Sequence, residues 1–291
     1  MNALKYFFPG LFFYPSRLVP DSIYLRIMYR FHTKKRLNLK NPKRYNEKLQ
    51  WLKLYNRNPE YMAMVDKILA KDYVSNKIGK EYVIPTIKVW DDAKSIDLKE
   101  LPASFVLKTN HDSKGVLVCK SVRDAIDADY KKFFAKRLKR NGYWYGREWP
   151  YKYVKPKVFA EELIECPEGS LKDYKVMCFG GVPKMIQVHN GRFSNHTQDY
   201  YDTEWNYLDI EQGCPPSGIV EDRPVFLDEM LRLSSVLSAG IPHLRVDWYY
   251  ANGRLFFGEL TFFDASGFDE FIPDCYNELV GSWIKLPVDN E

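Results

Sequence analysis

The spacing of apolar residues predicts helices in the first part of the chain. Leucines recur at helical spacing over 46–56, after an asparagine that can cap a helix. An Asn-Pro pair at 58–59 begins a second predicted helix, which reaches the glycine at position 79. Two further helices are expected over 122–139 and 225–239.

Short apolar or alternating runs predict strands between and after these helices. They lie at 82–90, 105–109, 157–164, 174–179, 183–189, 243–250 and 254–263. Gly180-Gly181 and Asn252-Gly253 are turn sequences that join the last four strands into two hairpins. Because strands and helices do not alternate with a regular βαβ period, the pattern predicts α+β subdomains rather than a doubly wound parallel sheet.

Composition indicates a folded protein with an unusual N-terminal segment. The chain has 291 residues, of which 45% are hydrophobic and 16% aromatic, so it can bury a substantial core. Residues 1–44 contain ten basic side chains and one acid. The net charge of this segment, 10 − 1 = +9, exceeds the net charge of +5 of the whole chain. Such a basic, aromatic arm suits an anionic membrane surface, a polyanionic substrate or an acidic partner, although it also fits a solvated face that binds nothing.

The cysteines and the hydrophobic segments indicate a compartment. Five cysteines are widely spaced without a CxxC pair, which predicts neither a disulfide framework nor a zinc site. The apolar run at 6–14 is interrupted by Pro9 and Gly10, so neither a membrane-spanning helix nor a signal peptide is expected. We therefore expect a cytoplasmic protein, with contact at the inner face of the membrane through the arm.

The C-terminal hairpin carries two acids in otherwise apolar strands. Alternation places Arg245 and Asp247 on one face of the first strand, and Glu259 and Thr261 share a face with the apolar residues before them on the second. If Asn252-Gly253 forms the turn, Asp247 and Glu259 are neighbours. Two carboxylates suit Mg²⁺, which commonly binds one or two of them together with nucleotide phosphates. The alternative is a solvated acidic face beside Arg245.

A lysine interrupts the apolar strand at 105–109. Lys108 precedes a loop of small and polar residues that ends at Gly115, and backbone N–H groups of such a loop can cradle phosphate. The loop lacks the G-x-x-x-x-G-K-[ST] pattern and is therefore not a Walker A loop. The alternative is a lysine at a sheet edge before an ordinary turn.

Taken in order, these features resemble the ATP-grasp superfamily. The matching elements are Asp66-Lys67 in a predicted helix, Gly79 and Pro85 after it, Lys108 before the loop to Gly115, Glu161-Glu162-Leu163-Ile164 with Glu168, and Arg245-Val246-Asp247 followed by Glu259. More narrowly, the chain resembles the TupA-like ATP-grasp family of bacterial surface-polysaccharide loci, from about residue 20 to residue 285. The segments that carry this resemblance are LNLKNP (37–42), YNEKLQWLK (45–53), FVLKTNH (105–111), DYK (173–175) and FGELTF (257–262).

The resemblance implies an α+β ATP-grasp fold in which the nucleotide lies between two α+β subdomains, with a helical, basic N-terminal segment. The implied divisions are an arm at 1–45, a helical and α+β subdomain at 46–100, a small subdomain with the phosphate loop at 101–165, and a C-terminal subdomain with the magnesium site at 166–291.

The resemblance also implies roles for individual residues. Lys67 and Lys108 are expected to contact phosphates or adenine, and the loop with His111, Ser113, Lys114 and Gly115 to close over the triphosphate. The adenine and ribose contacts are expected from Glu161, Glu162, Leu163, Ile164 and Glu168, and phosphate-side contacts from Asp173 and Lys175. Asp247, Glu259 and Thr261 are expected to hold Mg²⁺, and Arg245 with Lys108 to act in catalysis.

Two positions depart from the superfamily pattern. Thr261 stands where asparagine is common, and a hydroxyl is a poorer oxygen ligand than an amide carbonyl, so Asp264 is a candidate to complete the metal site. Lys114 stands in the phosphate loop where a small residue is usual.

The implied activity is ATP-dependent ligation of a carboxylate to an amine through an acyl phosphate. The polysaccharide context suggests a uronic-acid carboxylate joined to an amino acid or amino sugar, which Asp173 and a polar run between His189 and Asp199 could bind. A glycosyltransferase is the main alternative, but its D-x-D motif, Asp127-Ala128-Asp129, lies in a predicted helix. A non-catalytic scaffold is a further alternative, and nothing resembles a nucleic-acid-binding module.

Overall fold

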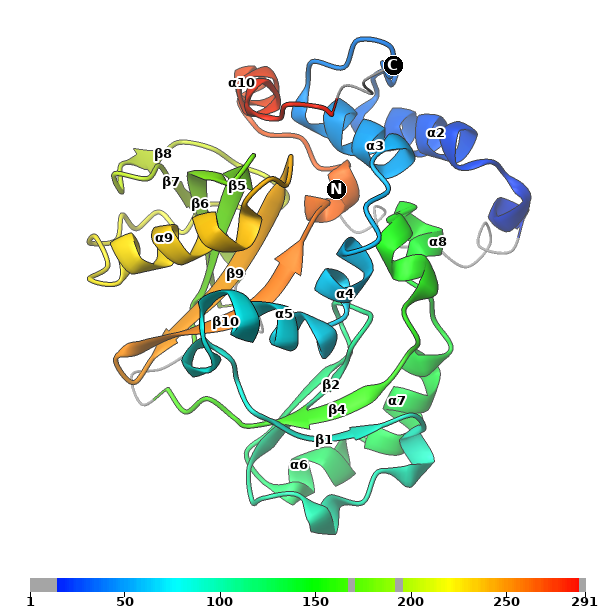
Figure 1. The fold of residues 1–291 in the computed structure, drawn as a ribbon, viewed down its shortest axis with the longest axis vertical. Coiled ribbons are helices and arrows are strands. Elements are labelled where there is room, and N and C mark those ends of the chain that lie inside the picture. Colours follow the sequence, from blue (N-terminus) through cyan, green and yellow to red (C-terminus); the bar gives the residue numbers. More distant parts are fainter. Residues whose placement is uncertain (1–14, 167–170, 192–195, 288–291) are drawn as a thin grey trace.

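Two antiparallel sheets form the framework of the computed structural model, which describes residues 15–166, 171–191 and 196–287 (Figure 1). The smaller sheet has the order β1-β4-β2-β3, with β1 Thr86–Trp90, β2 Phe105–Thr109, β3 Val116–Cys119 and β4 Val158–Glu161. The larger sheet has the order β10-β9-β5-β6-β7-β8, with β5 Asp173–Phe179, β6 Val182–Asn190, β7 Thr197–Tyr201, β8 Tyr207–Leu208, β9 Leu244–Ala251 and β10 Arg254–Thr261. The α+β class is therefore confirmed.

One face of the smaller sheet is covered by α6 (Val122–Asp127) and α7 (Tyr130–Leu138). Phe134 and Ala125 from these helices pack with Phe105 and Leu107 of β2. The prediction of one helix over 122–139 is wrong, because Asp129 adopts left-handed backbone geometry (φ 47°) and its side chain accepts the Lys132 N–H to begin a new helix. Since β1 pairs with β4, this sheet draws strands from both sides of the predicted division at residue 100.

The larger sheet buries one face under α9 (Leu227–Ser238). Val176 and Val246 lie in the same core as Leu233 and Leu237 of this helix, and the Trp248 indole N–H donates to the Ser234 hydroxyl at 2.8 Å. The opposite face of the sheet carries polar and charged side chains. This two-sided character leaves the polar face available for a site.

The helix predicted over 58–79 is two helices, α4 (Tyr61–Val65) and α5 (Leu69–Ile78). The Asp66 carboxylate accepts the Ile68 N–H at 2.9 Å, so it closes a turn instead of continuing α4. The prediction that Asp66 and Lys67 lie in a helix is therefore wrong, because both lie in the break. The strand predicted over 82–90 is shorter, since Pro85 precedes β1.

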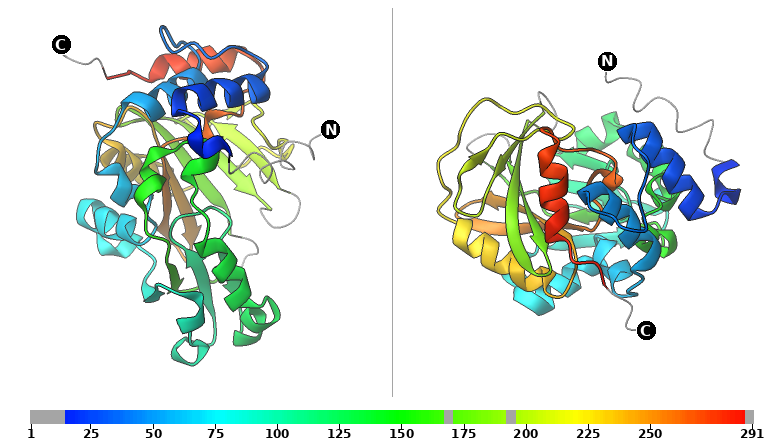
Figure 2. Two further views of the ribbon diagram at one scale, coloured as in Figure 1. Left: turned by 90° about the vertical axis from the view of Figure 1, so that its right-hand side faces the viewer. Right: turned by 90° about the horizontal axis from the view of Figure 1, so that it is seen from above.

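A helical layer covers one end of the larger sheet (Figure 2). It consists of α2 (Asp21–Thr33), α3 (Tyr45–Tyr55) and α10 (Cys275–Trp283). The backbone of α10 lies so close to the start of α3 that a Cβ on Gly281 would be 2.2 Å from the Lys43 carbonyl oxygen. Part of the predicted arm is thus a helix packed on the rest of the protein. No helix in the described part of the chain is both long and apolar enough to cross a membrane.

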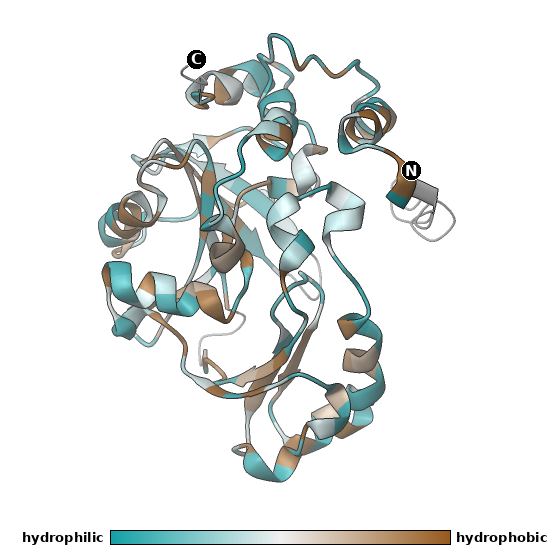
Figure 3. Ribbon diagram, turned by 45° about the vertical axis from the view of Figure 1, so that its right-hand side comes forward, coloured by the Kyte–Doolittle hydropathy of each residue, from teal (hydrophilic) through white to brown (hydrophobic). Residues whose placement is uncertain are grey.

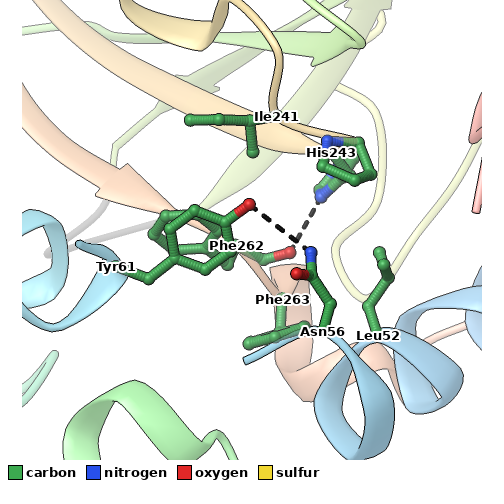
Figure 4. Close-up of a pocket in the computed structure, with 8 residues that line it drawn as sticks. Leu52, Asn56, Tyr61, Ile241, His243, Phe262 and Phe263 are labelled. Atoms are coloured by element: carbon green, nitrogen blue, oxygen red, sulfur yellow. Dashed lines mark hydrogen bonds between the residues drawn. The ribbon is translucent and has the colours of Figure 1, made fainter. Parts of the chain in front are cut away.

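A cavity of about 10 Å³ lies where α3 and α4 meet the start of β9 (Figure 4). Such a space can hold about one water molecule and no substrate. His243 lies beside it, donates from Nδ1 to the Phe262 carbonyl oxygen at 2.8 Å and accepts the Tyr45 hydroxyl at Nε2 at 3.1 Å. Both contacts fit one neutral tautomer, and burial lowers the pKa of His243 to about 4.

The lowered pKa of His243 leads us to expect that the folded protein loses stability in weak acid. The unfolded chain binds a proton at His243 near pH 6.5 and the folded protein only near pH 4, so stability is fully present above pH 6.5 and falls as the pH drops through this window. The contribution approaches about 3 kcal/mol at the lower limit. Urea unfolding of wild type and His243→Gln at pH 5 and pH 8 measures it. We expect the glutamine variant to lose less stability between the two pH values; equal losses would contradict the prediction.

Candidate functional site

A bulge in the C-terminal hairpin places Glu259 on the polar face of the larger sheet. Phe257 pairs with Trp248 and Leu260 with Val246, so Gly258 and Glu259 both lie opposite Asp247. Without the extra residue, the two-residue turn would place Glu259 opposite Val246 on the apolar face. The prediction that Glu259 shares a face with Leu255 and Phe257 is therefore wrong, while Glu259 and Asp247 do lie on one face.

Arg245 is the centre of the ionic cluster on this face. Its Nε and Nη2 donate to the two oxygens of Asp247, each at 2.8 Å, and Nη1 donates to Asp264. Nη2 also lies 3.2 Å from the Thr261 hydroxyl and 3.5 Å from Glu259 Oε1. One nitrogen therefore reaches the side chains of all three residues expected to hold Mg²⁺.

Lys175 completes the cluster from the neighbouring strand β5. It pairs with Asp247 in register, its ammonium donates to the Asp247 carboxylate, and it lies 3.1 Å from Asp173 Oδ2. Lys175 is 3% and Asp247 1% exposed, so these charges are largely shielded from water. Lys175, one of the two predicted phosphate-side residues, thus contacts the predicted metal ligand Asp247, and the other, Asp173, contacts Lys175.

The two central carboxylates have different electrostatic environments. Burial raises the pKa of Asp247 above its ordinary value, and Arg245 and Lys175 only partly oppose this effect. Burial also acts on Glu259, but Lys67, Lys175 and Arg245 outweigh it and hold the pKa of Glu259 well below its usual range. Glu259 is therefore a negative charge surrounded by three cations.

A second ionic cluster lies on the face of the smaller sheet that turns away from α6 and α7. Lys108 and Lys71 each donate to one oxygen of Glu161, with a distance of 2.8 Å for Lys71. Burial opposes ionisation of Glu161, but Lys108 and Lys71 outweigh it and lower its pKa. Both oxygens of Glu161 are thus engaged by lysines, one of which is Lys108.

The break between α4 and α5 connects the two clusters. The Lys67 ammonium lies 2.9 Å from Glu259 Oε2 on the larger sheet. The Lys67 N–H donates to the Asn110 carbonyl oxygen at 3.0 Å, and the Asn110 amide donates to Asp66 at 2.8 Å, immediately after β2 of the smaller sheet. The departure from helical geometry at Asp66 is what lets Lys67 reach both sheets.

The loop between β2 and β3 is closed by Asp112. One oxygen of its carboxylate accepts the Thr109 hydroxyl at 2.7 Å and the Gly115 N–H at 2.6 Å, and the other pairs with Arg137 at 3.0 Å. A Cβ on Gly115 would lie 1.9 Å from the Thr109 hydroxyl oxygen, so this position requires glycine unless Thr109 moves. The predicted phosphate loop is thus a compact turn.

The predicted adenine segment borders a hollow of about 200 Å³. Glu162, Leu163 and Ile164 line one side, and Ile84, Pro85, Arg254 and Phe256 are among the residues that line the rest. Phe256 pairs with Tyr249, which places it on the same sheet face as Asp247. An apolar ring beside backbone hydrogen-bonding groups is an arrangement suited to a planar base.

The other predicted site residues have different environments. Ser113 and Lys114 are exposed at the tip of the loop. His111 is 3% exposed, with Nδ1 3.3 Å from the Asn110 amide oxygen, while its Nε2 has no partner within the described structure. Glu168 lies outside the described residues.

Sequence reasoning missed three side chains that organise the site. Lys71 gave no signal, since it is one of several lysines on an amphipathic helix. Gln187 donates to Asp264 at 2.9 Å and fixes the acid that pairs with Arg245. Lys53 is buried and donates to the carbonyl oxygens of Gly146 and Ser266 at 2.6 and 2.7 Å. Its position among the leucines of α3 was the available signal.

Lys53 supports the segment that follows β10. Ala265 and Ser266 both have left-handed backbone geometry, with φ of 45° and 52°. The contact from Lys53 to Ser266, together with the Ser266 hydroxyl donated to Glu148 at 2.5 Å, holds this strained turn next to Asp264. Burial lowers the pKa of Lys53 to about 7.

The donor set at Asp247 and Glu259 fits magnesium. Across the described residues, no group of three or more His, Cys, Asp or Glu side chains forms a metal site. Two carboxylates that share the Arg245 nitrogen nevertheless match the sparse protein ligation of Mg²⁺, which relies on substrate phosphates and water for its other oxygens. Lys67, Lys175 and Arg245 at the same place suit those phosphates.

Comparison with known proteins gives a family and distant structural relatives. Residues 47–285 match the protein family described as TupA-like ATPgrasp. The D-alanine–D-alanine ligase from Helicobacter pylori is 15% identical with a TM-score of 0.46, covering 83% of this chain and 69% of that enzyme. The Bacillus anthracis D-alanine–D-alanine ligase complexed with ATP is 14% identical with a TM-score of 0.40, covering 68% of this chain.

The ATP-grasp ligase PsnB, in a structure with minimal precursor, Mg and ADP, is 11% identical with a TM-score of 0.38, covering 74% of this chain. The chain spans 53% of the length of the Bacillus anthracis ligase and 57% of PsnB. No curated protein matched the sequence.

Proposed function

The chain belongs to the TupA-like ATP-grasp family, and from this premise we propose that it is an ATP- and Mg²⁺-dependent ligase that joins a carboxylate to an amine. The observation that carries the proposal is that Asp247 and Glu259 lie on one sheet face in contact with three cations. These cations are Lys67, Lys175 and Arg245. Two oxygen ligands for a metal next to several phosphate-binding groups are what phosphoryl transfer from a nucleotide requires.

ATP would lie between the two sheets. Its adenine would occupy the hollow beside 162–164, and its phosphates would lie between Lys108 and the cluster around Arg245. Mg²⁺ bound by Asp247 and Glu259, with Thr261 or Asp264 nearby, would neutralise charge on the phosphates. Binding of this kind would release Lys67 and Lys108 from their carboxylate partners toward phosphate oxygens.

The reaction would proceed in two displacements. A carboxylate oxygen of the substrate attacks the γ-phosphorus, the bond to the β-phosphate oxygen breaks, and ADP leaves. The amine nitrogen then attacks the carbonyl carbon of the acyl phosphate, phosphate leaves, and the nitrogen loses a proton to form the amide. Arg245 is the candidate to stabilise the oxyanion of the second step, since its guanidinium stays charged and is fixed by Asp247 and Asp264.

The acceptor proposed is a uronic-acid-containing sugar of surface-polysaccharide synthesis. Neutral hydrogen-bonding groups continue the polar sheet face beyond Lys175, since Gln187 pairs with Lys175 and His189 with Asp173. His189 and His196, half-buried and 2.9 Å apart at Nδ1 and Nε2, are the accessible end of this row. Such groups suit hydroxyls of a sugar. Arg192 and Asn195, part of the same predicted run, lie outside the described residues.

The test is release of ADP and phosphate by the full chain with Mg²⁺. Amino acids and amino sugars are offered with glucuronate or galacturonate, and UDP-sugars are offered in parallel. We expect turnover that needs ATP, a carboxylate and an amine, and hydroxylamine should replace the amine to give a hydroxamate. Sugar transfer from a UDP donor without ATP turnover would overturn the ligase and favour the glycosyltransferase, although Asp127 and Asp129 lie exposed at the break between α6 and α7.

A further inference from the structure

The outward face of α2 carries large apolar side chains that nothing in the described structure covers. Ile23, Ile27 and Phe31 are spaced four residues apart and are 51%, 60% and 57% exposed. The same helix buries Leu25 and Tyr29 completely on its inner side. Figure 3 shows that α2 combines hydrophobic and hydrophilic residues. The inner side of α2 is therefore packed against the protein, and the outer row of Ile23, Ile27 and Phe31 is exposed.

A stripe of cations runs beside these apolar residues. Arg26 and Arg30 are exposed and one helical turn apart on α2, and the exposed Lys34, which caps the C-terminal end of the helix, places its ammonium 5.0 Å from the centre of the Phe31 ring. They donate to the carbonyl oxygens of Leu37, Lys34 and Phe31 respectively. Among the ion pairs of the described residues, none links these three cations to a carboxylate.

The surroundings of α2 extend the same character. Leu18, just before the helix, is 90% exposed, and the exposed side chains of Arg17, Arg36 and Lys40 add further positive charge. The sequence before residue 15 reads MNALKYFFPGLFFY, with one charged side chain and nine large apolar or aromatic residues. A second copy of this chain would present the same positive face and repel it. An anionic surface with an apolar interior complements both stripes.

We propose that the outward face of α2 docks the protein on an anionic lipid bilayer, with the helix lying in the plane of the membrane. Ile23, Ile27 and Phe31 enter the boundary between headgroups and acyl chains, while Arg26, Arg30 and Lys34 contact lipid phosphates. This inference is independent of the proposed ligase activity, because it uses a face of the protein that contains no residue of that site.

The experiment is co-sedimentation of the full chain with vesicles of phosphatidylglycerol and phosphatidylcholine, against vesicles of phosphatidylcholine alone. Binding should need the anionic lipid and should weaken as salt rises from about 0.1 to about 0.5 M. Two triple variants test the face, Ile23→Ser with Ile27→Ser and Phe31→Ser, and Arg26→Gln with Arg30→Gln and Lys34→Gln. The charge variant should bind about 100-fold more weakly, and the apolar variant at least about tenfold more weakly.

Matched controls remove equal numbers of exposed groups elsewhere. They are Ile219, Val220 and Val225 to serine, and Lys94, Lys99 and Lys120 to glutamine. Retained binding in both controls supports the proposal, and equal loss in them overturns it. Absence of binding by wild type overturns it too. The proposal also fails if the α2 variants bind normally while a full chain with Phe7, Phe8, Phe12 and Phe13 changed to serine does not, or if wild type dimerises through this face without lipid.

Discussion

Replacement of Glu259 by glutamine is expected to lower Mg²⁺-dependent ATP turnover by about 100- to 1,000-fold. The change keeps the size of the side chain and one carbonyl oxygen but removes its charge. Lys67 at 2.9 Å and Arg245 at 3.5 Å would then face an amide instead of a carboxylate. A divalent cation bound as proposed would lose one of its two carboxylate ligands, and no third acidic ligand in the described residues forms part of a metal site with them.

The measurement is the rate of ADP release against Mg²⁺ concentration, with thermal unfolding recorded beside it. The variant should need more Mg²⁺ for half-maximal rate, and a merely structural role would not move that requirement. Glu204→Gln is the control, since Glu204 is exposed on the far part of the larger sheet beyond β7 and should turn over ATP as wild type does. Unchanged turnover and Mg²⁺ dependence in Glu259→Gln would refute the metal assignment.

The hairpin shows what the sequence could and could not predict. Alternating residues and the Asn252-Gly253 turn were sufficient to predict both strands, β9 and β10, nearly to their ends. Alternation alone could not place Glu259, because a strict period of two puts it with the apolar residues of β10. The extra residue lies at the bulge, where the backbone of Gly258 approaches β9 closely. A Cβ on Gly258 would lie 3.1 Å from the Asp247 carbonyl oxygen. That contact is tertiary.

Two other elements show the same limit. Apolar spacing predicted a helix through Asp66 and Lys67, and the break there combines the local turn closed by Asp66 with two hydrogen bonds to Asn110, which is far away in sequence. The role of Lys71 depends on Glu161, 90 residues away. A charge in an otherwise apolar strand singled out Lys108 and Asp247 as candidates, whereas Lys67 became a candidate only through the order of motifs that the chain shares with the ATP-grasp superfamily. Lys71 and Gln187 occupy ordinary polar positions, so nothing in the sequence distinguished them from their neighbours.

Replacement of Lys108 by methionine is expected to lower ATP turnover by about 100-fold or more, mainly through weaker ATP binding. Lys108 is the only residue of its strand, β2, that places a cation on the site side of the smaller sheet. Its ammonium contacts Glu161, and a phosphate at this place would receive the same charge-assisted hydrogen bonds that the carboxylate accepts.

Lys71 provides a matched control for this prediction. It lies on α5, forms an ion pair with the other oxygen of Glu161, and is buried to a degree similar to Lys108. Lys71→Met should destabilise the protein to urea about as much as Lys108→Met does, since each removes one half of the same buried ion pair. Turnover in Lys71→Met should fall less than about tenfold, because Lys71 also donates to the Ile84 carbonyl oxygen and the Thr86 hydroxyl and so belongs to the scaffold.

If both variants lost ATP affinity equally, the two lysines would act only through Glu161, and direct contact of Lys108 with phosphate would be wrong. Different affinities at similar stabilities would assign the phosphate contact to Lys108.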